Sequence, residues 1–471
     1  MMLRKLGLAL GLLTALTTAS EADEYFPSPQ PLSNSGAPVV AFMGDSITAR
    51  GANIGATTIA SENIGFAYWV GALTGYRVWS PVYNNFGING NSTPQMLARM
   101  SSMLAVHPDI CIFEAAINDV QGLPSAGPDT TPGTVEYNLR QMYDEAQAAN
   151  CIVIAVTIPS VTTFSYWNGG GNSELIALQV NEWIRRQKTF RKGFYVADLA
   201  ASYDDPTNTT HWAPRTNFGD PNSLPHPMTW GAYAQAVPVA AIINALYPQW
   251  RAGIANVDDV YNATYNPTGN LLPNQMFTGN GGGFSGGGTT SGSIASGWTV
   301  FTNSLLGSAV AASKTAWSDG SPAQTLVISG TANGSGGIVS AEIGMTAGNF
   351  NVGDTIECRM LAAWGATTNI SMVRLMFQDV ENSTADFLQD GDNDASSPQA
   401  GYSLPTDTTN ANAPASLSIA LITPQWKVAS TVSFPQLWLQ IGYVTPLSSA
   451  TVAGTFQFAK PECRKVPVAS P

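Results

Sequence analysis

The stretch Val39-Val40-Ala41-Phe42-Met43 runs directly into Gly44-Asp45-Ser46. An unbroken apolar run of this length is typical of a strand covered on both faces, as the strands of a parallel sheet are. Similar runs stand at Ile110–Phe113, Ile152–Val156 and Phe194–Ala197. These runs predict strands of one parallel sheet, and they place Ser46 just beyond the end of the first strand.

Amphipathic stretches with helical periodicity accompany these runs. They cover residues 134–149 and 174–187, and a third stretch, Thr229–Leu246, is rich in Ala and Ile. Strands that alternate with helices predict an α/β sandwich with right-handed crossovers. We therefore expect residues 37–250 to form one α/β domain.

The character of the sequence changes after residue 250. Residues 251–268 are predicted to form a linker, and residues 269–465 show no helical period. Short β runs separated by turn residues predict an antiparallel sandwich there; they lie at 324–329, 354–360, 371–377, 417–421, 437–441 and 455–458. The Gly-rich run from Gly279 to Gly292 reads as a flexible linker when taken alone, and inside such a sandwich it would be a loop.

The charge balance restricts the possible partners. The 471 residues include 20 Lys and Arg against 32 Asp and Glu, which gives a net charge of −12, and only 3 residues are His. Nucleic-acid binding needs basic side chains to neutralise phosphates. The composition therefore argues against a nucleic-acid partner.

The N-terminus has the pattern of a secretory signal. Residues 1–20 contain Arg4 and Lys5, then an apolar run, then small residues. The apolar run is too short for a stable membrane anchor. We expect residues 1–20 to be cleaved as a signal peptide and the mature protein to be secreted, extracellular or periplasmic, without an anchor.

Ser46 is the candidate nucleophile, because ligands of open α/β sheets bind at the carboxyl ends of the strands. Three further polar segments lie at the same predicted edge: residues 85–91 and Ala116-Ile117-Asn118-Asp119 follow strands, and His226-Pro227 precedes the last predicted helix. Ser46 would attack an ester carbonyl, and His226 would take its proton and return it to the leaving alcohol. The N–H groups of Ser46 and Gly90 and the Asn118 amide would hold the oxyanion.

These blocks, in this order, make the sequence resemble the GDSL/SGNH hydrolase family of esterases, lipases and acetylesterases. The resemblance covers about residues 37–250. It implies a flavodoxin-like three-layer parallel sheet. It also implies Ser46 as nucleophile, Gly90 and Asn118 as oxyanion donors and His226 as base, with no metal and no cofactor.

The sequence departs from the family pattern at two places. Ala116 stands where the family usually has Gly, and we expect its backbone to keep φ below zero. The family places its triad Asp three residues before the His, where this sequence has Ser223. We assign the acid to Asp220, and the alternative is a backbone carbonyl near Ser223 that orients His226.

Other carboxyl groups near the blocks have smaller predicted roles. Glu114 either supports the site as a buried, hydrogen-bonded carboxyl or faces solvent near its mouth. We expect Asp45 and Asp119 to fix loops. Asp204 and Asp205 are weaker candidates for the triad acid.

Several aromatic residues are candidates for stacking on sugar rings. Trp167 and Trp212 lie in loops near the active edge and are the candidate substrate-binding residues, with ordinary packing as the alternative. Trp317, Trp364 and Tyr402 are the corresponding candidates in the C-terminal region.

The C-terminal region resembles jelly-roll carbohydrate-binding modules over residues 269–465. The resemblance rests on the opening residues 270–277, on Gly297-Trp298 and on residues 352–355 before a predicted strand. It implies a sugar-binding sandwich, and a spacer or assembly sandwich is the alternative.

Four cysteines are too few for a scaffold built on disulfides. Cys111 and Cys151 fall in or beside predicted buried strands, where we expect inert thiols. Cys358 and Cys463 lie near strand ends of the C-terminal region and are the better candidates for a disulfide in an oxidising compartment.

These features predict a secreted serine esterase that removes acyl groups, acetyl above all, from a polysaccharide through a covalent acyl-enzyme. One alternative is an extracellular lipase or general carboxylesterase with some other ester substrate. The other is a non-catalytic carbohydrate-binding or surface or virion assembly protein with a decayed hydrolase domain. Acyl chain-length preference separates the first two, and absence of fluorophosphonate labelling would favour the last.

Overall fold

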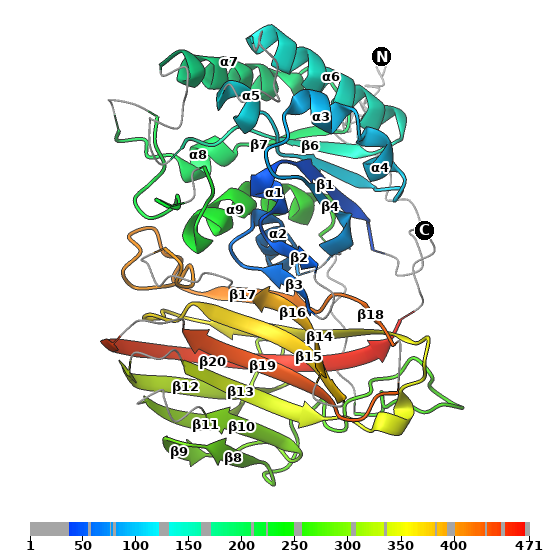
Figure 1. Cartoon of the computed structure of the whole chain (residues 1–471). Coiled ribbons are helices and arrows are strands. Elements are labelled where there is room, and N and C mark those ends of the chain that lie inside the picture. The colour runs from blue at the N-terminus through cyan, green and yellow to red at the C-terminus, as the bar shows by residue number, and fades with distance from the viewer. Residues whose placement is uncertain are drawn as a thin grey trace, which may run out of the picture.

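The computed structural model has a mixed helix-and-strand region beside a region built of strands (Figure 1). It describes residues 37–54, 58–75, 77–78, 82–121, 131–161, 171–208, 212–222, 225–248, 257–302, 308–333, 337–381, 384–392, 401–428, 431–443 and 448–466. The predicted signal peptide lies outside these ranges.

A five-stranded parallel sheet forms the centre of the N-terminal region. Its strands are β1 (Val40–Gly44), β4 (Asn85–Gly87), β5 (Ile110–Phe113), β6 (Ile152–Val156) and β7 (Phe194–Ala197), in the order β4-β1-β5-β6-β7. Numbered along the chain, this is the order 2-1-3-4-5 of flavodoxin-like sheets. The predicted parallel sheet is confirmed. Every residue of β1, β5 and β6 is buried, which explains their unbroken apolar runs.

Helices cover both faces of this sheet. α2 (Phe66–Thr74) and α9 (Thr229–Leu246) lie toward the C-terminal region, whereas α6 (Pro132–Ala148) and α7 (Gly171–Gln187) cover the opposite face (Figure 1). The shorter helices are α1 (Ser46–Ala49), α3 (Thr93–Leu97), α4 (Met100–Leu104), α5 (Ile117–Gln121) and α8 (Leu199–Tyr203), with a 3-10 turn at Val82–Asn84. The three helices predicted from periodicity are therefore present as α6, α7 and α9.

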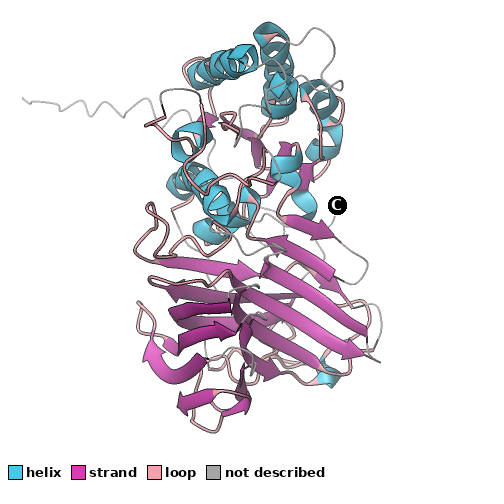
Figure 2. Ribbon diagram, turned by 60° about the vertical axis from the view of Figure 1, so that its left-hand side comes forward, coloured by secondary structure: helices cyan, strands magenta, loops and turns pink. Residues whose placement is uncertain are grey.

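The C-terminal region consists of two mostly antiparallel sheets, whose strands form the lower part of the molecule in Figure 2. One has the order β2-β3-β16-β15-β19-β13-β10-β8, and the other has the order β17-β14-β20-β12-β11-β9, with β18 paired to β14. The strands after β7 are β8 (Gly283–Gly286), β9 (Thr289–Gly292), β10 (Trp298–Thr302), β11 (Ser308–Ala316), β12 (Pro322–Asn333), β13 (Gly337–Gly344), β14 (Thr355–Trp364), β15 (Met372–Glu381), β16 (Thr384–Asp392), β17 (Leu417–Ile422), β18 (Trp426–Lys427), β19 (Pro435–Tyr443) and β20 (Ser448–Lys465).

The Gly-rich run is built into these sheets, so its interpretation as a flexible linker or a loop was wrong. β8 pairs in parallel with β10, and β9 pairs in parallel with β11. A Cβ at Gly286 would lie 2.0 Å from the Thr302 carbonyl oxygen, and one at Gly292 would lie 1.9 Å from that of Ala312. Glycine is needed there because the neighbouring backbone comes too close for a side chain.

Two short strands of the N-terminal region belong to a C-terminal sheet. β2 (Ala52–Ile54) and β3 (Thr58–Glu62) pair with each other, and β3 pairs in parallel with β16. Just beyond β3, the Asn63 amide donates to the Ser371 carbonyl at 3.0 Å. The chain that leaves α1 thus runs into the C-terminal sheet before it returns to α2.

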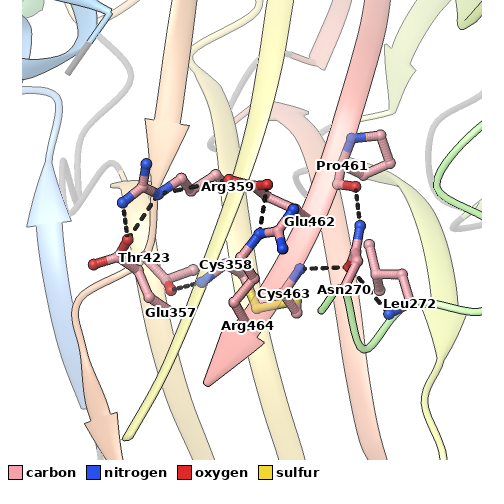
Figure 3. The surroundings of a disulfide bond; sticks show 10 residues. All are labelled: Asn270, Leu272, Glu357, Cys358, Arg359, Thr423, Pro461, Glu462, Cys463 and Arg464. Carbon is pink, nitrogen blue, oxygen red and sulfur yellow. Dashed lines mark hydrogen bonds and ion pairs between the residues drawn. A yellow bond between two sulfur atoms is a disulfide. The ribbon is translucent and has the colours of Figure 1, made fainter. Parts of the chain in front are cut away.

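Both pairs of cysteines form disulfides. Cys358 and Cys463 stand opposite each other on β14 and β20, as predicted (Figure 3). Cys111 and Cys151 are also bonded, so the expectation of inert thiols was wrong. Cys111 lies opposite Val153, two residues after Cys151, so both cysteines face the same side of the sheet. Their Cα atoms are 5.9 Å apart, which suits a disulfide.

The segment before the C-terminal sheets is fixed against their last long strand. Asn270 accepts from the Cys463 N–H at 3.0 Å and donates to the Pro461 carbonyl at 3.0 Å (Figure 3). Arg464 pairs with Asp259, and the Lys465 ammonium donates to the Tyr261 hydroxyl at 3.0 Å. Within the described ranges, no helix is both long and apolar enough to cross a membrane.

The two disulfides predict a thiol count and a difference in stability. Protein folded under oxidising conditions should show no free thiol to Ellman's reagent in guanidinium without reductant. The bridges span 40 and 105 residues, so the chain-entropy model gives about 4 and about 5 kcal/mol for their contributions. Replacing a cysteine pair by Ala should therefore lower the free energy of unfolding more for Cys358 and Cys463 than for Cys111 and Cys151. Urea unfolding of the two double variants measures this difference. Two titratable thiols in the unreduced protein would contradict the Cys111–Cys151 bond.

Candidate functional site

The turn after β1 presents Ser46 at the carboxyl edge of the parallel sheet. Ser46 is half-buried and begins α1, and Asp45 caps this helix by accepting from the Ile47 N–H at 2.9 Å. A Cβ at Gly44 would lie 2.0 Å from the Thr48 hydroxyl oxygen and 2.7 Å from the Glu114 carbonyl oxygen. The Gly-Asp-Ser order thus follows from a tight strand-to-helix turn.

The loop after β4 brings Gly90 to the same edge. Gly90 has φ +74, and no atom lies within 4 Å of the place where a Cβ would be, so its Cα faces open space. This left-handed conformation is what favours glycine there. The Ile88 N–H donates to the Gly44 carbonyl at 3.2 Å, which fixes the loop against the end of β1.

Arg99 braces this loop, a role that no sequence motif indicated. Its Nη2 donates to the Gly44 carbonyl at 2.8 Å, its Nε donates to Asn91 Oδ1 at 3.0 Å, and its Nη1 donates to the Phe86 carbonyl. Partial burial lowers the pKa of Arg99. One guanidinium therefore ties the nucleophile turn to the loop that carries Gly90.

The third block places Asn118 beside that loop. Asn118 is buried at the start of α5, and its amide donates to the Asn91 carbonyl at 2.9 Å. This bond uses one of the two amide N–H donors. Asp119 accepts from the Thr93 N–H at 2.9 Å and from its hydroxyl at 2.6 Å, so it fixes a loop as predicted. Ser46, Gly90 and Asn118 thus follow three neighbouring strands and meet at one edge.

The expectation for Ala116 was wrong. Its φ is +86, in the left-handed region that disfavours a side chain. The residue is fully buried, and its carbonyl accepts from the Val120 N–H at 3.1 Å. The chain adopts here the backbone that glycine normally supplies, at a cost of roughly 1–2 kcal/mol.

Two buried carboxyl groups lie directly behind Ser46. Glu114 is buried rather than solvent-facing, and its Oε2 accepts from the Thr48 hydroxyl at 2.9 Å. The remaining oxygens, Asp45 Oδ2 and Glu114 Oε1, are also buried and accept no bond from another group. Burial, followed by the charge of Glu114, raises the pKa of Asp45 well above its usual value, and burial raises that of Glu114 to about 7. Burial therefore favours the protonated form of both carboxyl groups.

His226 lies in a narrow loop, opposite Asp220. The Asp220 N–H donates to the His226 carbonyl at 2.8 Å, and Gly219 bridges to Pro227. The Asp220 carboxylate is buried; its Oδ2 accepts from Arg50 Nη2 at 3.1 Å and from the Tyr402 hydroxyl at 2.5 Å, and its Oδ1 accepts from the Asn222 N–H at 2.9 Å. Asp220 and His226 are thus direct neighbours across the loop. Ser223, the alternative position for orienting the His, lies outside the described residues.

The weaker acid candidates are engaged elsewhere. Asp204 accepts from the Ser160 N–H at 3.1 Å and its hydroxyl at 2.6 Å, and it also accepts from the Trp212 indole. Burial raises the pKa of Asp204 to about 7. Asp205 accepts from Thr207. The Trp212 ring is therefore held in place by its indole nitrogen, while Trp167 lies outside the described residues.

Three aromatic candidates of the C-terminal region are buried, so the expectation that they stack on sugars was wrong. Trp317, Trp364 and Tyr402 expose 7%, 3% and 7% of their surface. The Trp364 indole donates to the Thr406 hydroxyl at 3.1 Å, and the Tyr402 hydroxyl donates to Asp220. In the described part of the chain, no group of three or more His, Cys, Asp or Glu side chains is placed to hold a metal ion.

The buried carboxyl pair predicts a pH dependence of stability. A pKa raised from 4.5 to about 7 means that the folded protein keeps a proton that the unfolded chain releases. The contribution of Glu114 is therefore greatest below about pH 4.5 and is lost as the pH rises toward 7. Between pH 4.5 and 8 the free energy of unfolding of the wild type should fall by on the order of 3 kcal/mol more than that of Glu114→Gln. Urea unfolding at the two pH values measures both changes.

A surface variant serves as the control for this measurement. Glu182→Gln alters an exposed i,i+4 ion pair with Arg186 and should keep the wild-type pH slope. An identical pH slope for Glu114→Gln and the wild type would contradict the raised pKa of Glu114.

Residues 42–234 match the model of the GDSL-like Lipase/Acylhydrolase family. None of the curated proteins matches the chain. Similar solved structures include a GDSL-like lipase from Bacteroides thetaiotaomicron, at 17% identity and TM-score 0.33, covering 48% of this chain and 95% of that one. A catalytic mutant of Axe2, an acetylxylan esterase from Geobacillus stearothermophilus, has 18% identity and TM-score 0.34, with coverage of 48% and 100%. The acetyl xylan esterase AlAXEase has 18% identity and TM-score 0.30, with coverage of 44% and 99%. The family model supports the resemblance seen in the four sequence blocks, over residues that run from β1 into α9.

Proposed function

We propose that this protein is a serine ester hydrolase that works through a covalent acyl-enzyme. The observation that carries the proposal is the meeting of Ser46, Gly90 and Asn118 at the ends of three neighbouring strands. His226 acts as the base, and Asp220 across its loop is the proposed acid. The match of residues 42–234 to an acylhydrolase family supports this chemistry.

The proposed reaction assigns a role to Ser46, His226, Gly90 and Asn118. Ser46 Oγ attacks the ester carbonyl while His226 takes the Ser46 proton, and the leaving alcohol receives that proton. The N–H groups of Ser46 and Gly90 and the second amide donor of Asn118 hold the oxyanion. Water then attacks the acyl-enzyme by the same steps in reverse.

We further propose that the substrate is an acylated polysaccharide and that the acyl group is acetyl. One face of the eight-stranded sheet is the observation that supports a carbohydrate substrate. Leu437, Leu439 and Ile441 enter the core, so Trp438 and Gln440 alternate to the other face of the sheet, where Trp438 is half-buried and Gln440 is buried. Gln440 accepts from Arg374 Nε at 2.8 Å and donates to the Ser340 hydroxyl at 3.2 Å. A half-buried Trp on a sheet face suits the apolar face of a sugar ring, and the buried Gln440 network fixes the strand that carries it.

The proposed organisation follows from these roles. Residues 1–20 serve as a signal peptide, so the mature protein is secreted without a membrane anchor. Residues 37–250 form the catalytic domain, 251–268 the linker and 269–465 the carbohydrate-binding sandwich.

The nucleophile is tested by fluorophosphonate labelling. The wild type should gain one adduct by intact-mass spectrometry, and Ser46→Ala should gain none and lose esterase activity by a factor of about 10⁴ or more. Ser101→Ala removes an exposed hydroxyl from α4 and should label like the wild type. Equal labelling of Ser46→Ala and the wild type would exclude Ser46, and an unlabelled wild type would favour a decayed hydrolase.

The substrate is tested by acetate release from a panel of acetylated polysaccharides, compared with hydrolysis of p-nitrophenyl acetate. Trp438→Ala should lower the rate on the best polymer about tenfold and leave the small ester unchanged, because only the polymer reaches the sheet. Tyr265→Ala, which removes an aromatic ring that is 88% exposed, is the control and should affect neither rate. A preference for long acyl chains over acetyl would instead favour a lipase.

A further inference from the structure

We infer that the segment Gly401-Tyr402-Ser403-Leu404 of the C-terminal region completes the hydrolase site and that Tyr402 is a positioning residue for His226. The inference rests on the proposed function and adds to it a role for the C-terminal region that involves no sugar. The segment makes hydrogen bonds both with the C-terminal sheets and with the start of α9.

On one side the segment is anchored in the C-terminal sheets. The Leu404 N–H donates to the Ile370 carbonyl at 2.7 Å, just before β15. The next residues are fixed by Thr406, whose hydroxyl accepts from the Trp364 indole at 3.1 Å, and by a bridge between Asp407 and Thr367. The position of Tyr402 is therefore set by the C-terminal region.

On the other side the segment clamps the start of α9. The Trp230 N–H donates to the Gly401 carbonyl at 3.1 Å, and its indole donates to the Leu404 carbonyl at 3.1 Å. The Thr229 hydroxyl donates to the Tyr402 carbonyl at 3.3 Å. These residues follow His226 by only three and four positions, so the clamp fixes the backbone where the proposed base is attached.

The fit at Gly401 shows how closely the segment approaches. Gly401 has φ +99, and a Cβ there would lie 2.3 Å from the Asn217 carbonyl oxygen and 2.4 Å from Met228 Sδ. Met228 and Tyr402 also form a small apolar cluster with Ile64, which follows β3. Contact at this distance leaves no room for a side chain at Gly401.

The Tyr402 hydroxyl reaches the carboxylate of Asp220, the residue whose N–H binds the His226 carbonyl. It donates to Asp220 Oδ2 at 2.5 Å and accepts from Arg50 Nη2 at 3.4 Å. Burial raises the pKa of Asp220, but the hydrogen bonds from Tyr402, the Asn222 N–H and Arg50 outweigh it and hold that pKa below its usual value. Asp220 is thus a buried anion that depends on donors from both regions.

Arg50 connects the same carboxylate to the nucleophile. The Arg50 N–H donates to the Ser46 carbonyl at 2.9 Å and so closes α1. The Arg50 side chain pairs with Asp220 at 3.1 Å, and the Asp220 N–H binds the His226 carbonyl at 2.8 Å. A loose Asp220 would therefore disturb the spacing between Ser46 and His226, and Tyr402 is the group from the C-terminal region that holds it.

Tyr402→Phe tests this role because it removes one hydroxyl and keeps the ring. We expect kcat for p-nitrophenyl acetate and the rate of fluorophosphonate labelling to fall about tenfold, the size expected for losing a hydrogen bond to a charged group. KM should stay within about twofold and Tm within about 3 °C of the wild type. Tyr261→Phe, which loses a hydroxyl bonded to Lys465, is the matched control and should keep wild-type rates.

A double-mutant cycle separates positioning from general destabilisation. If Tyr402 acts through Asp220, then adding Tyr402→Phe to Asp220→Asn should cause almost no further loss of kcat. Equal rates for Tyr402→Phe and the wild type, or losses that simply add in the double variant, would overturn the inference.

The imidazole signals of His226 provide a readout that needs no catalysis. In ¹⁵N-histidine-labelled protein, with His226→Gln used for assignment, Tyr402→Phe should shift the His226 ring signals and Tyr261→Phe should not. Unchanged signals would overturn the inference even in a protein without esterase activity. An unlabelled wild type with shifted His226 signals would reject the proposed function and leave the role of Tyr402 standing.

Discussion

The parallel pairing of β1 between β4 and β5 is the constraint on which the candidate site depends. Phe42 lies opposite both Asn85 and Ile112, so the three strands end at one edge and deliver Ser46, the Gly90 loop and Asn118 together. The sheet ladder alone could not hold these loops, because each turn is irregular and leaves backbone groups without ladder partners. Arg99 and the Asp45–Glu114 pair satisfy or shield those groups from behind.

The sequence predicted the elements whose signal is local. The apolar runs predicted β5, β6 and β7 to the residue, and the polar blocks placed Ser46, Gly90 and Asn118 after the correct strands. Such features are encoded in a few consecutive residues, since burial on both faces demands an unbroken apolar run and a tight turn demands glycine. The same reasoning located Cys358 and Cys463 near neighbouring strand ends.

Features that depend on which distant segments meet were not predictable in this way. Nothing in residues 52–62 indicates that they pair with β16, and the Cys111–Cys151 bond depends on the register between β5 and the start of β6. Tyr402 resembled a surface aromatic because its partner, Asp220, lies 182 residues away. The positive φ of Ala116 also could not be predicted, because alanine by itself prefers a negative φ. The structure around this fully buried residue holds it in the less favourable conformation.

Each region contributes a segment that packs into the other region, and these two segments limit how the C-terminal region can act. β3, which follows α1 in the chain, pairs with β16 in the eight-stranded sheet. Residues 401–404 of the C-terminal region form hydrogen bonds with the start of α9. A module joined only by a flexible linker raises the local concentration of substrate and leaves its orientation free. Here a change in orientation would break a β-ladder and the hydrogen bond from Tyr402 to the Asp220 carboxylate, which is worth roughly 1.5–3 kcal/mol as a bond to a charged group. The C-terminal region therefore acts through fixed geometry, and its contacts with Asp220 are as much a part of the site as the strands that carry Ser46.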